Sequence, residues 1–508
     1  MLFFIPIFVL ILFLYFFKNT FLAIFSSIIS IFILINNSNN IGIVKNINLL
    51  IGTAYSVIIN HSNYCVVLFL VLISWAILIL TESQVMESYK FYISKYINSK
   101  KGLEFNILWP SLLLCLDDWL IMTSLKNFYF PLISHYKISK ERFGYFLSNI
   151  APCATSLNPF STWGALFLVQ LGIIKQQIGI SVSIFDLLLA SIPFFFYQIS
   201  AILVSFISVI KQKSIGFMSL YDIKGNFSKD SFYKNKNNES KYDFLIFILL
   251  PIFLYGTIIF NIIDILKSNP DLSFSQSMGD FDAAPILVKG VLYGIFAIII
   301  FLILIKSLNY KFFLRTAKDN FISFLKPAAM LFSSWIFAKC LYLVIDSKSL
   351  SLFIEVNSSI NIFLPLIFML MSMIMSAIMG TEWGSISMIS PLISLVHINC
   401  NIPLLFAAVV SGATAGTQLS PLSNTVVTAS VISEISSFDL FKAQNAYVFI
   451  SIILSSIGFL ISGILFNFFK FETNFVLLFT WIFIFLFIPL IYILIDKIYK
   501  KFNIVKGN

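Results

Sequence analysis

Three acidic residues inside apolar segments are the positions in this sequence best suited to carry a proton. Asp117 and Asp118 are adjacent in the apolar run 105–125, and Glu382 lies between two further runs. Ionisable groups at membrane depth are costly and are usually functional. Adjacent carboxylates also titrate as a coupled pair, which suits a proton carrier. Neighbours on a regular helix point about 100° apart, so we expect one aspartate to face the site. The alternative is that both lie at a water-exposed helix end.

Neutral oxygen-bearing side chains gather near two prolines that interrupt apolar runs. Asn158-Pro159 and Ser420-Pro421 each place a favoured N-cap residue before Pro, which predicts a half-helix that starts inside the membrane. Broken backbone at that depth is tolerated only where it is buried in protein or lines a cavity. The segment 411–430 holds ten Ser, Thr, Asn or Gln side chains and no charge, which suits a hard cation such as Na⁺. The alternative is ordinary Ser and Thr packing between membrane helices.

These elements occur twice in the chain. Residues 151–162 and 413–424, which are 262 positions apart, share five identical pairs. The pairs are Ala151/Ala413, Thr155/Thr417, Leu157/Leu419, Pro159/Pro421 and Ser161/Ser423. An acid–Trp pair precedes each proline, with Trp119 40 residues before Pro159 and Trp383 38 residues before Pro421. Paired interruptions in two halves are typical of secondary transporters, whose binding site lies where the repeats meet.

The composition places the chain in a membrane. Of 508 residues, 59% are hydrophobic and 11% are charged, against about 25% charged in a soluble domain. This composition excludes a soluble globule and a disordered chain. A transmembrane β-barrel is excluded because the apolar runs are long and continuous. The net charge of +10 reflects Lys in cytoplasmic loops and does not indicate nucleic-acid binding. The five Cys and three His are scattered, so we expect neither a transition-metal site nor an enzyme.

We predict an all-α polytopic membrane protein with about 11–13 membrane segments, in two inverted repeats with broken or re-entrant helices. The placement of Lys sets the orientation. Residues 211–241 hold seven Lys and three acids, and residues 264–282 hold four Asp and one Lys. The first stretch and the Lys-rich C-terminus are therefore predicted to be cytoplasmic, and the second stretch external. The predicted parts are an N-terminal transmembrane half (1–210), a cytoplasmic polar linker (211–243) and a C-terminal transmembrane half (244–508).

The motifs resemble those of the NhaC-type sodium/proton antiporters, a family of the ion-transporter superfamily. The first-half match comprises the aspartate pair in LDDWL, the loop KISKE at 137–141 and PFSTW at 159–163. The second-half match comprises GTEWG at 380–384 and GTQLSPLSNT at 416–425. These correspond to the family's Gly-Thr-Ser-Trp-Gly and Gly-Asp-x-x-Ser-Pro-[LI]-Ser-Asp-Thr motifs. The resemblance runs from about residue 65 to the C-terminus.

The resemblance implies a secondary active transporter of a bacterial cytoplasmic (inner) membrane that exchanges Na⁺ for H⁺ by alternating access. Its partners would be membrane lipid and small cations, with no cofactor and, by family analogy, a homodimeric assembly. Proton or ion coupling is expected at Asp117, Asp118 and Glu382, and a Na⁺ site at Asp117, Ser161, Ser423 and Asn424. The full set of expected substrate- or ion-binding residues is Asn158, Ser161, Thr162, Thr381, Ser420, Ser423, Asn424 and Thr425.

Three positions depart from the family pattern. Thr417 and Asn424 stand where the family has Asp, and Glu382 stands where it has Ser, so the charge of the site is rearranged. Lys339 is a candidate for a positive charge that replaces a bound cation; the alternative is that it snorkels to the membrane interface. The Ser-Asn-Thr triplet at 423–425 also resembles one of sodium-coupled carboxylate transporters. The alternative function is therefore a sodium- or proton-coupled transporter of organic anions or amino acids.

Overall fold

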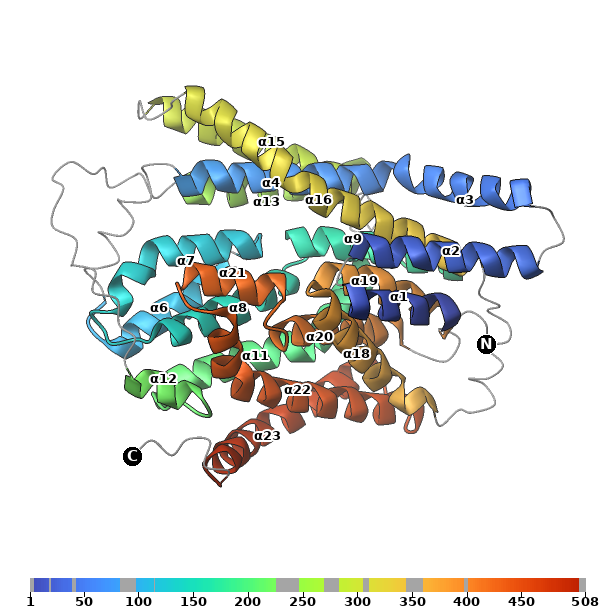
Figure 1. Cartoon of the computed structure of the whole chain (residues 1–508). Helices are drawn as coiled ribbons and strands as arrows, with labels where there is room; N and C mark the ends of the chain where they lie inside the picture. The colour runs from blue at the N-terminus through green and yellow to red at the C-terminus, as the bar shows by residue number, and fades with distance from the viewer. Residues whose placement is uncertain are drawn as a thin grey trace.

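The chain folds into long helices laid side by side (Figure 1). The computed structural model describes residues 4–17, 20–38, 43–82, 97–113, 115–224, 246–268, 283–304, 310–343, 360–396 and 401–501. Within these ranges the chain is helical and forms no strand, which confirms the predicted all-α class. Residues 225–243 of the predicted linker and 269–282 of the predicted external loop lie outside the described residues.

In chain order the helices are α1 (Phe4–Phe17), α2 (Thr20–Ser38), α3 (Ile43–Ile58), α4 (His61–Glu82), α6 (Lys100–Leu113), α7 (Asp118–Ile133), α8 (Lys140–Leu157), α9 (Thr162–Ile178), α10 (Ile184–Ser191), η1 (Ile192–Phe194), α11 (Phe196–Lys211), α12 (Met218–Lys224), α13 (Ile246–Ser268), α15 (Ala283–Leu304), α16 (Tyr310–Tyr342), α18 (Ile360–Met379), α19 (Glu382–Ile389), η3 (Ser390–Leu395), α20 (Ile402–Gln418), α21 (Asn424–Ile432), α22 (Ser437–Asn467) and α23 (Thr473–Lys501).

Six of the described helices are long and apolar enough to cross a membrane, namely α4, α13, α15, α18, α22 and α23. The pairs α8–α9 and α10–α11 are bent by 52° and 43°, and the number rises to eight if each pair forms one span. Shorter apolar helices lie at Phe21–Asn36, Ile43–Ile58 and Ile402–Gln418. Among the described residues the full spans are therefore fewer than the 11–13 predicted segments, because that number also included short and interrupted pieces.

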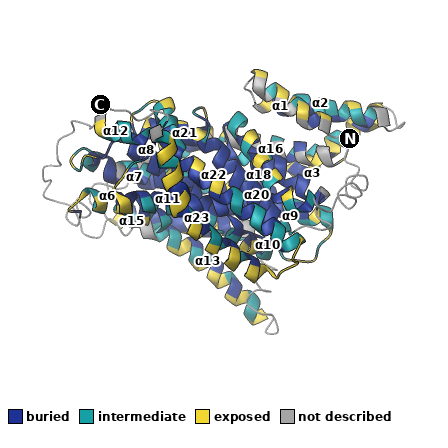
Figure 2. Cartoon of the chain, turned by 90° about the horizontal axis from the view of Figure 1, so that it is seen from below, coloured by how far each residue is buried: buried dark blue, intermediate teal, exposed yellow. Residues whose placement is uncertain are grey.

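The bundle has a buried centre and an apolar outer surface. Figure 2 shows buried residues concentrated in the middle of the bundle and exposed residues along its peripheral helices. On α13, α15 and α23 most of the exposed residues are apolar, and Phe260, Leu304 and Leu486 have 69%, 74% and 68% of their surface accessible. Such side chains find a favourable environment in lipid, so these helices form the lipid-facing boundary.

The predicted breaks exist, but their N-caps lie three residues further along the chain than expected. Asn158 is the C-cap of α8, and Ser161 is the N-cap of α9, where its hydroxyl accepts a hydrogen bond from the Gly164 N–H at 3.0 Å. Ser423 caps α21 in the same way, accepting from the Val426 N–H at 3.2 Å. The expectation that Asn158 and Ser420 are N-caps was therefore wrong, because the serine after each proline already satisfies the freed N–H.

The sequence repeat is also a repeat of local structure. The Ser161 hydroxyl donates to the Thr155 carbonyl at 2.7 Å, and the Ser423 hydroxyl donates to the Thr417 carbonyl at 2.7 Å. The residue after each serine donates its backbone N–H across the break, to Leu116 at 2.9 Å in the first half and to Gly380 at 2.8 Å in the second. The half-helices that begin at these serines differ in length, since α9 has 17 residues and α21 has nine.

Close packing between α18 and α20 fixes the position of the second break. Gly412 and Gly416 lie against backbone carbonyls of α18, so that a Cβ at Gly416 would come within 2.1 Å of the Met373 oxygen. Small residues at four-residue spacing permit such close approach between membrane helices. The Ser372 hydroxyl strengthens the contact by donating to the Val409 carbonyl at 2.7 Å.

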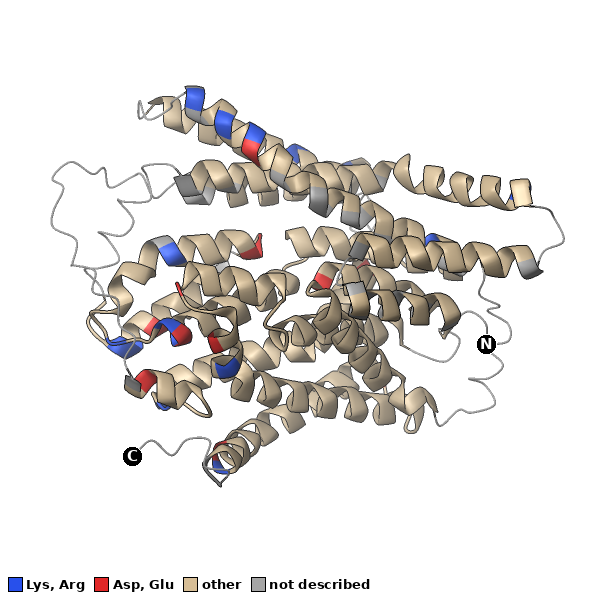
Figure 3. Cartoon of the chain, in the orientation of Figure 1, with Lys and Arg blue, Asp and Glu red and all other residues tan. Residues whose placement is uncertain are grey.

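A charged cluster joins the start of the predicted linker to the bundle. Arg142 is 1% exposed and pairs with Glu104 at 2.5 Å, and its guanidinium also donates to Ser214 at 3.0 Å. Nearby, the Tyr221 hydroxyl on α12 donates to Asp439 of α22 at 2.9 Å. The first part of the linker is therefore docked on α8 and α22. Figure 3 shows that long stretches of the other helices carry no charged residue.

The α18–α20 packing predicts a selective effect of added methyl groups. Gly416→Ala should destabilise the protein by about 1–3 kcal/mol, because the methyl group overpacks the contact. Gly256→Ala on α13 is the matched control, since nothing lies within 4 Å of a Cβ there. Thermal unfolding of the purified variants in detergent measures the difference. Equal unfolding midpoints for the two variants would contradict the close contact.

Candidate functional site

Asp117 and Asp118 lie at a helix break. Helix α6 ends at Leu113 and α7 begins at Asp118, with Asp117 in extended conformation as its N-cap. The Asp117 Oδ1 accepts a hydrogen bond from the Leu120 N–H at 3.1 Å. The regular helix assumed from the sequence was therefore wrong at this point. Both carboxylates sit at the positive end of the α7 dipole, which stabilises negative charge.

The two half-helices of the first repeat meet at Asp117. Its Oδ2 accepts from the Thr162 hydroxyl at 3.1 Å, and Thr162 is the first residue of α9. Asn158 braces the same break, since its amide donates to the Cys115 carbonyl at 3.0 Å and to the Tyr255 hydroxyl at 2.9 Å. The N-termini of α7 and α9 therefore converge on one buried carboxylate.

The second repeat has the same arrangement around Glu382, the first residue of α19. Its Oε1 accepts from the hydroxyls of Thr417 and Thr425, each at 2.5 Å. Both threonines and the glutamate are at most 5% exposed. Thr381 is the N-cap of α19 and is also buried, but its side chain makes no capping hydrogen bond. Thr425 belongs to the first turn of α21, so the N-termini of α19 and α21 converge on Glu382.

The predicted Na⁺ ligands fall into separate environments. The Ser161 and Ser423 hydroxyls are engaged in the two break hydrogen bonds with backbone atoms. Ser420 is buried beside Ser423, whereas the Asn424 side chain is exposed. Within the described ranges no hydrogen bond joins these residues to Asp117. The side-chain oxygens that lie within hydrogen-bond distance form two groups. One group is Asp117 with Thr162, and the other is Glu382 with Thr417 and Thr425.

Thr417 was not among the predicted binding residues. It forms one of the repeated pairs, with Thr155, and it stands at a position where the resembled family has Asp. Its contact with Glu382 relates two of the three departures from that family. Relative to that family's pattern, a carboxylate is absent at position 417 and present at position 382. The side chains of Thr417 and Glu382 are hydrogen-bonded, so the negative charge lies on the other partner of the same contact.

The acids of the two repeats lie near one another. Asp118 is close enough to both Asp117 and Glu382 for their charges to interact. Helix α21 packs on α7 and α8, and α9 packs on α19, so the broken helices of the two halves cross at this point. In the part of the chain that the structure covers, none of the ion pairs involves these three acids. We call Asp117, Asp118 and Glu382 the acid cluster.

Lys339 lies elsewhere. It is exposed on α16, and its Nζ donates to the Ser56 hydroxyl of α3 at 2.9 Å. The structure therefore favours the interfacial interpretation of this residue over a role as a charge inside the site.

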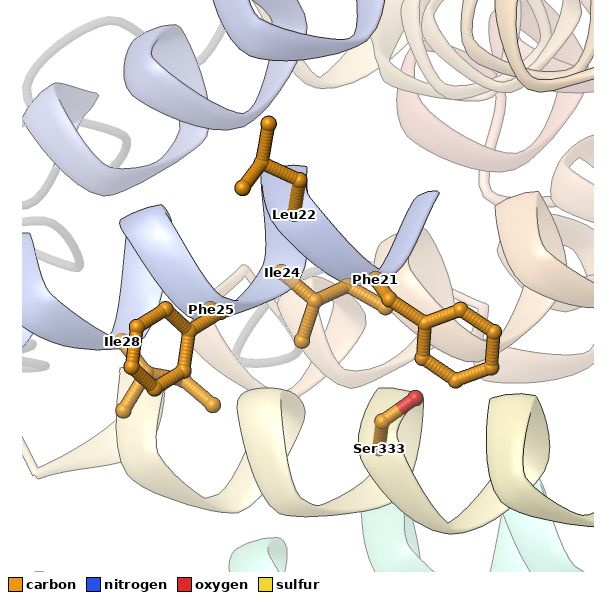
Figure 4. A pocket seen from close by; sticks show the side chains of 6 residues that line it. All are labelled: Phe21, Leu22, Ile24, Phe25, Ile28 and Ser333. Carbon is orange, nitrogen blue, oxygen red and sulfur yellow. The ribbon is translucent and has the colours of Figure 1, made fainter. Parts of the chain in front are cut away.

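The pocket in Figure 4 is also distinct from the acid cluster. It measures about 500 Å³ and is lined by Phe21, Leu22, Ile24, Phe25, Ile28 and Ser333, which belong to α2 and α16. One hydroxyl among apolar side chains cannot coordinate a cation, which needs several oxygen ligands.

Comparison with known proteins gives a family profile that matches more than half of the chain. The sequence profile described as the Na+/H+ antiporter family matches residues 156–464, a range that contains Glu382 and both serine-capped breaks. An uncharacterized protein of Haemophilus influenzae is 23% identical over 415 residues, which cover 79% of this chain and 79% of that protein.

The Glu382–Thr417 contact predicts a charge-swap effect on stability. Thr417→Asp should lower stability by about 1–3 kcal/mol, because a second carboxylate would face Glu382 and a buried hydrogen bond would be lost. Adding Glu382→Ser to this variant should recover most of the loss, since one carboxylate and one hydroxyl again face each other. Unfolding midpoints in detergent measure both effects.

Thr417→Asn is the matched control, because its amide adds no charge and can still donate to Glu382. If the double variant is no more stable than Thr417→Asp alone, the two positions do not share one charge.

Proposed function

Because this chain belongs to the Na+/H+ antiporter family, we propose that it exchanges Na⁺ for H⁺ across the membrane by alternating access. The observation that carries this proposal is the acid cluster, which gathers three buried or half-buried carboxylates without a Lys or Arg partner among the described ion pairs. A proton and a small cation are the two species that relieve such a charge, and they compete for it.

The strength of that competition follows from electrostatics. Two like charges 4 Å apart repel by about 4 kcal/mol at an effective dielectric constant of about 20. Helix N-termini and threonine hydroxyls offset part of this repulsion, and a bound Na⁺ or H⁺ offsets the remainder. Sodium binding at the cluster therefore favours proton release, and protonation favours sodium release, which is the coupling that an antiporter requires.

The proposal includes an inverted arrangement of the two repeats. Lys140 at the start of α8 pairs with Glu434, just after the end of α21, at 2.7 Å. At the other end, α10, which follows α9, packs on α20. These contacts support repeats that run in opposite directions, so that each exposes the cluster to a different face of the membrane.

The membrane orientation proposed from the sequence is compatible with an ion pair between the start of the linker and the end of α23. Lys213, at the start of the predicted linker, pairs with Asp496 near the end of α23 at 3.2 Å. The start of the linker and the end of α23 therefore share one side, for which the Lys bias favours the cytoplasm. We place the protein in a bacterial cytoplasmic membrane, with lipid, Na⁺ and H⁺ as its partners and no cofactor.

Transport of an organic anion remains the second candidate, on one specific observation. Four half-helix N-termini, those of α7, α9, α19 and α21, lie around the site, and helix N-termini attract anionic groups. The acid cluster repels an anion, however, and this favours cation exchange.

Flux measurements test the proposal. In proteoliposomes that carry a proton gradient, addition of Na⁺ should dissipate the gradient with the wild-type protein. The double variant Asp117→Asn/Asp118→Asn and the single variant Glu382→Gln should each lower the rate of Na⁺-dependent proton movement at least about tenfold. Removing a charge that binds the ion should weaken this binding by more than about 1.4 kcal/mol, which corresponds to a factor of about ten. Asp186→Asn on α10, outside the cluster, should leave the rate unchanged.

Two results would overturn the assignment. Wild-type rates in the cluster variants would show that these acids do not carry the coupling. Uptake of labelled carboxylates without any Na⁺-dependent proton movement would favour the organic-anion candidate.

A further inference from the structure

One face of α9 carries polar atoms that have no hydrogen-bond partner among the described residues. Trp163, Gln170 and Gln177 are spaced seven residues apart, so they lie in one row along the helix. The Trp163 Nε1, the Gln170 Oε1 and the Gln177 Oε1 are buried and unpaired. Trp163 and Gln170 are fully buried side chains.

A second polar row faces this one. Helix α19 and the η3 segment pack along α9, and the Gln170 Nε2 lies 3.4 Å from the Ser387 hydroxyl of α19. Ser390, three residues further on, is fully buried and its hydroxyl has no partner. We call these five residues the α9 seam.

Another buried glutamine of the bundle is fully satisfied. The Gln198 amide on α11 donates to the Val410 carbonyl at 3.2 Å and to the Thr414 hydroxyl at 3.0 Å, and its oxygen accepts from Ser411 at 3.1 Å. A native interior normally pairs its polar groups in this way. Buried polar atoms left unpaired in a row are suited to binding water or an ion that comes and goes.

The α9 seam starts at the acid cluster. Its inner end, Trp163, comes directly after Thr162, whose hydroxyl donates to Asp117. On the opposite side, α19 starts at Glu382. The outer end of the seam, Gln177, lies in the last turn of α9, two residues before the left-handed Gly179 that ends the helix. The row therefore connects the candidate ion site with one end of the bundle.

We propose that the α9 seam is the path along which water and a hydrated monovalent cation move between the acid cluster and the membrane face at the end of α9. The identity of the cargo rests on the function proposed above. The described structure holds the path closed, since Gln170 and Ser390 are excluded from solvent. Opening requires α9 to separate from α19 and η3, which would hydrate the unpaired atoms.

Cysteine labelling tests the path directly. In a variant whose five native cysteines are replaced, Gln170→Cys, Gln177→Cys and Ser390→Cys are exposed in vesicles to a membrane-impermeant thiol reagent from either face. We expect labelling from one face only, at least about tenfold faster than for Ser200→Cys, because a thiol reacts through its hydrated thiolate. Ser200 is the control because it is fully buried on α11, also with an unpaired hydroxyl.

Flux in the otherwise native chain gives a second measurement. Gln177→Leu should slow Na⁺-dependent proton movement at least about tenfold by making the path apolar, since apolar constrictions exclude water. Gln176→Leu, its exposed neighbour on α9, should leave the rate unchanged.

The two proposals fail in different ways. Seam cysteines that label as slowly as Ser200→Cys from both faces, together with a wild-type rate in Gln177→Leu, would overturn the path even where Na⁺ exchange is observed. One-sided labelling in a protein that moves no Na⁺ would support the path and overturn the cargo.

Discussion

The structure depends on how it satisfies the backbone groups that its broken helices release inside an apolar bundle. An unpaired N–H or C=O in this environment costs several kcal/mol, so a break is possible only where partners are built in. In each repeat, one serine hydroxyl accepts from an N–H of the half-helix after the break and donates to a carbonyl of the helix before it. The next residue bonds across to the neighbouring break. These few bonds allow four half-helix N-termini to surround a group of carboxylates.

The carboxylates use the groups that the breaks provide. Asp117 caps α7, and Glu382 opens α19, so each receives the favourable end of a helix dipole. Threonine hydroxyls supply further donors without adding charge. Among the described residues no Lys or Arg forms an ion pair with these carboxylates, so their charge is available to a mobile cation or a proton.

Several of these features can be predicted from the sequence. The 262-residue offset locates both serine-capped breaks, and the resemblance to sodium/proton antiporters agrees with the family match. The break at Asp117 cannot be predicted in this way, because no Pro or Gly lies at the junction between α6 and α7. The caps are wrongly predicted at Asn158 and Ser420, because local preference cannot show that a later serine bonds back to the preceding helix. Glu382 and Thr417, which are in contact, are 35 residues apart in the sequence. The sequence indicates this contact only through two substitutions relative to the family pattern, the loss of a carboxylate at 417 and the gain of one at 382.

The two repeats match at their breaks but differ in the half-helices beyond them. At about 1.5 Å per residue, α9 is about 25 Å long and α21 about 13 Å. Exchanging the conformations of the two repeats would therefore not reproduce the same molecule upside down. In the alternating access proposed above, the two open states would differ in hydrophobic thickness and in lipid contacts, and so in free energy. The proposed exchanger would then have an intrinsic resting side, and the composition and thickness of the host bilayer would shift the balance between its two states.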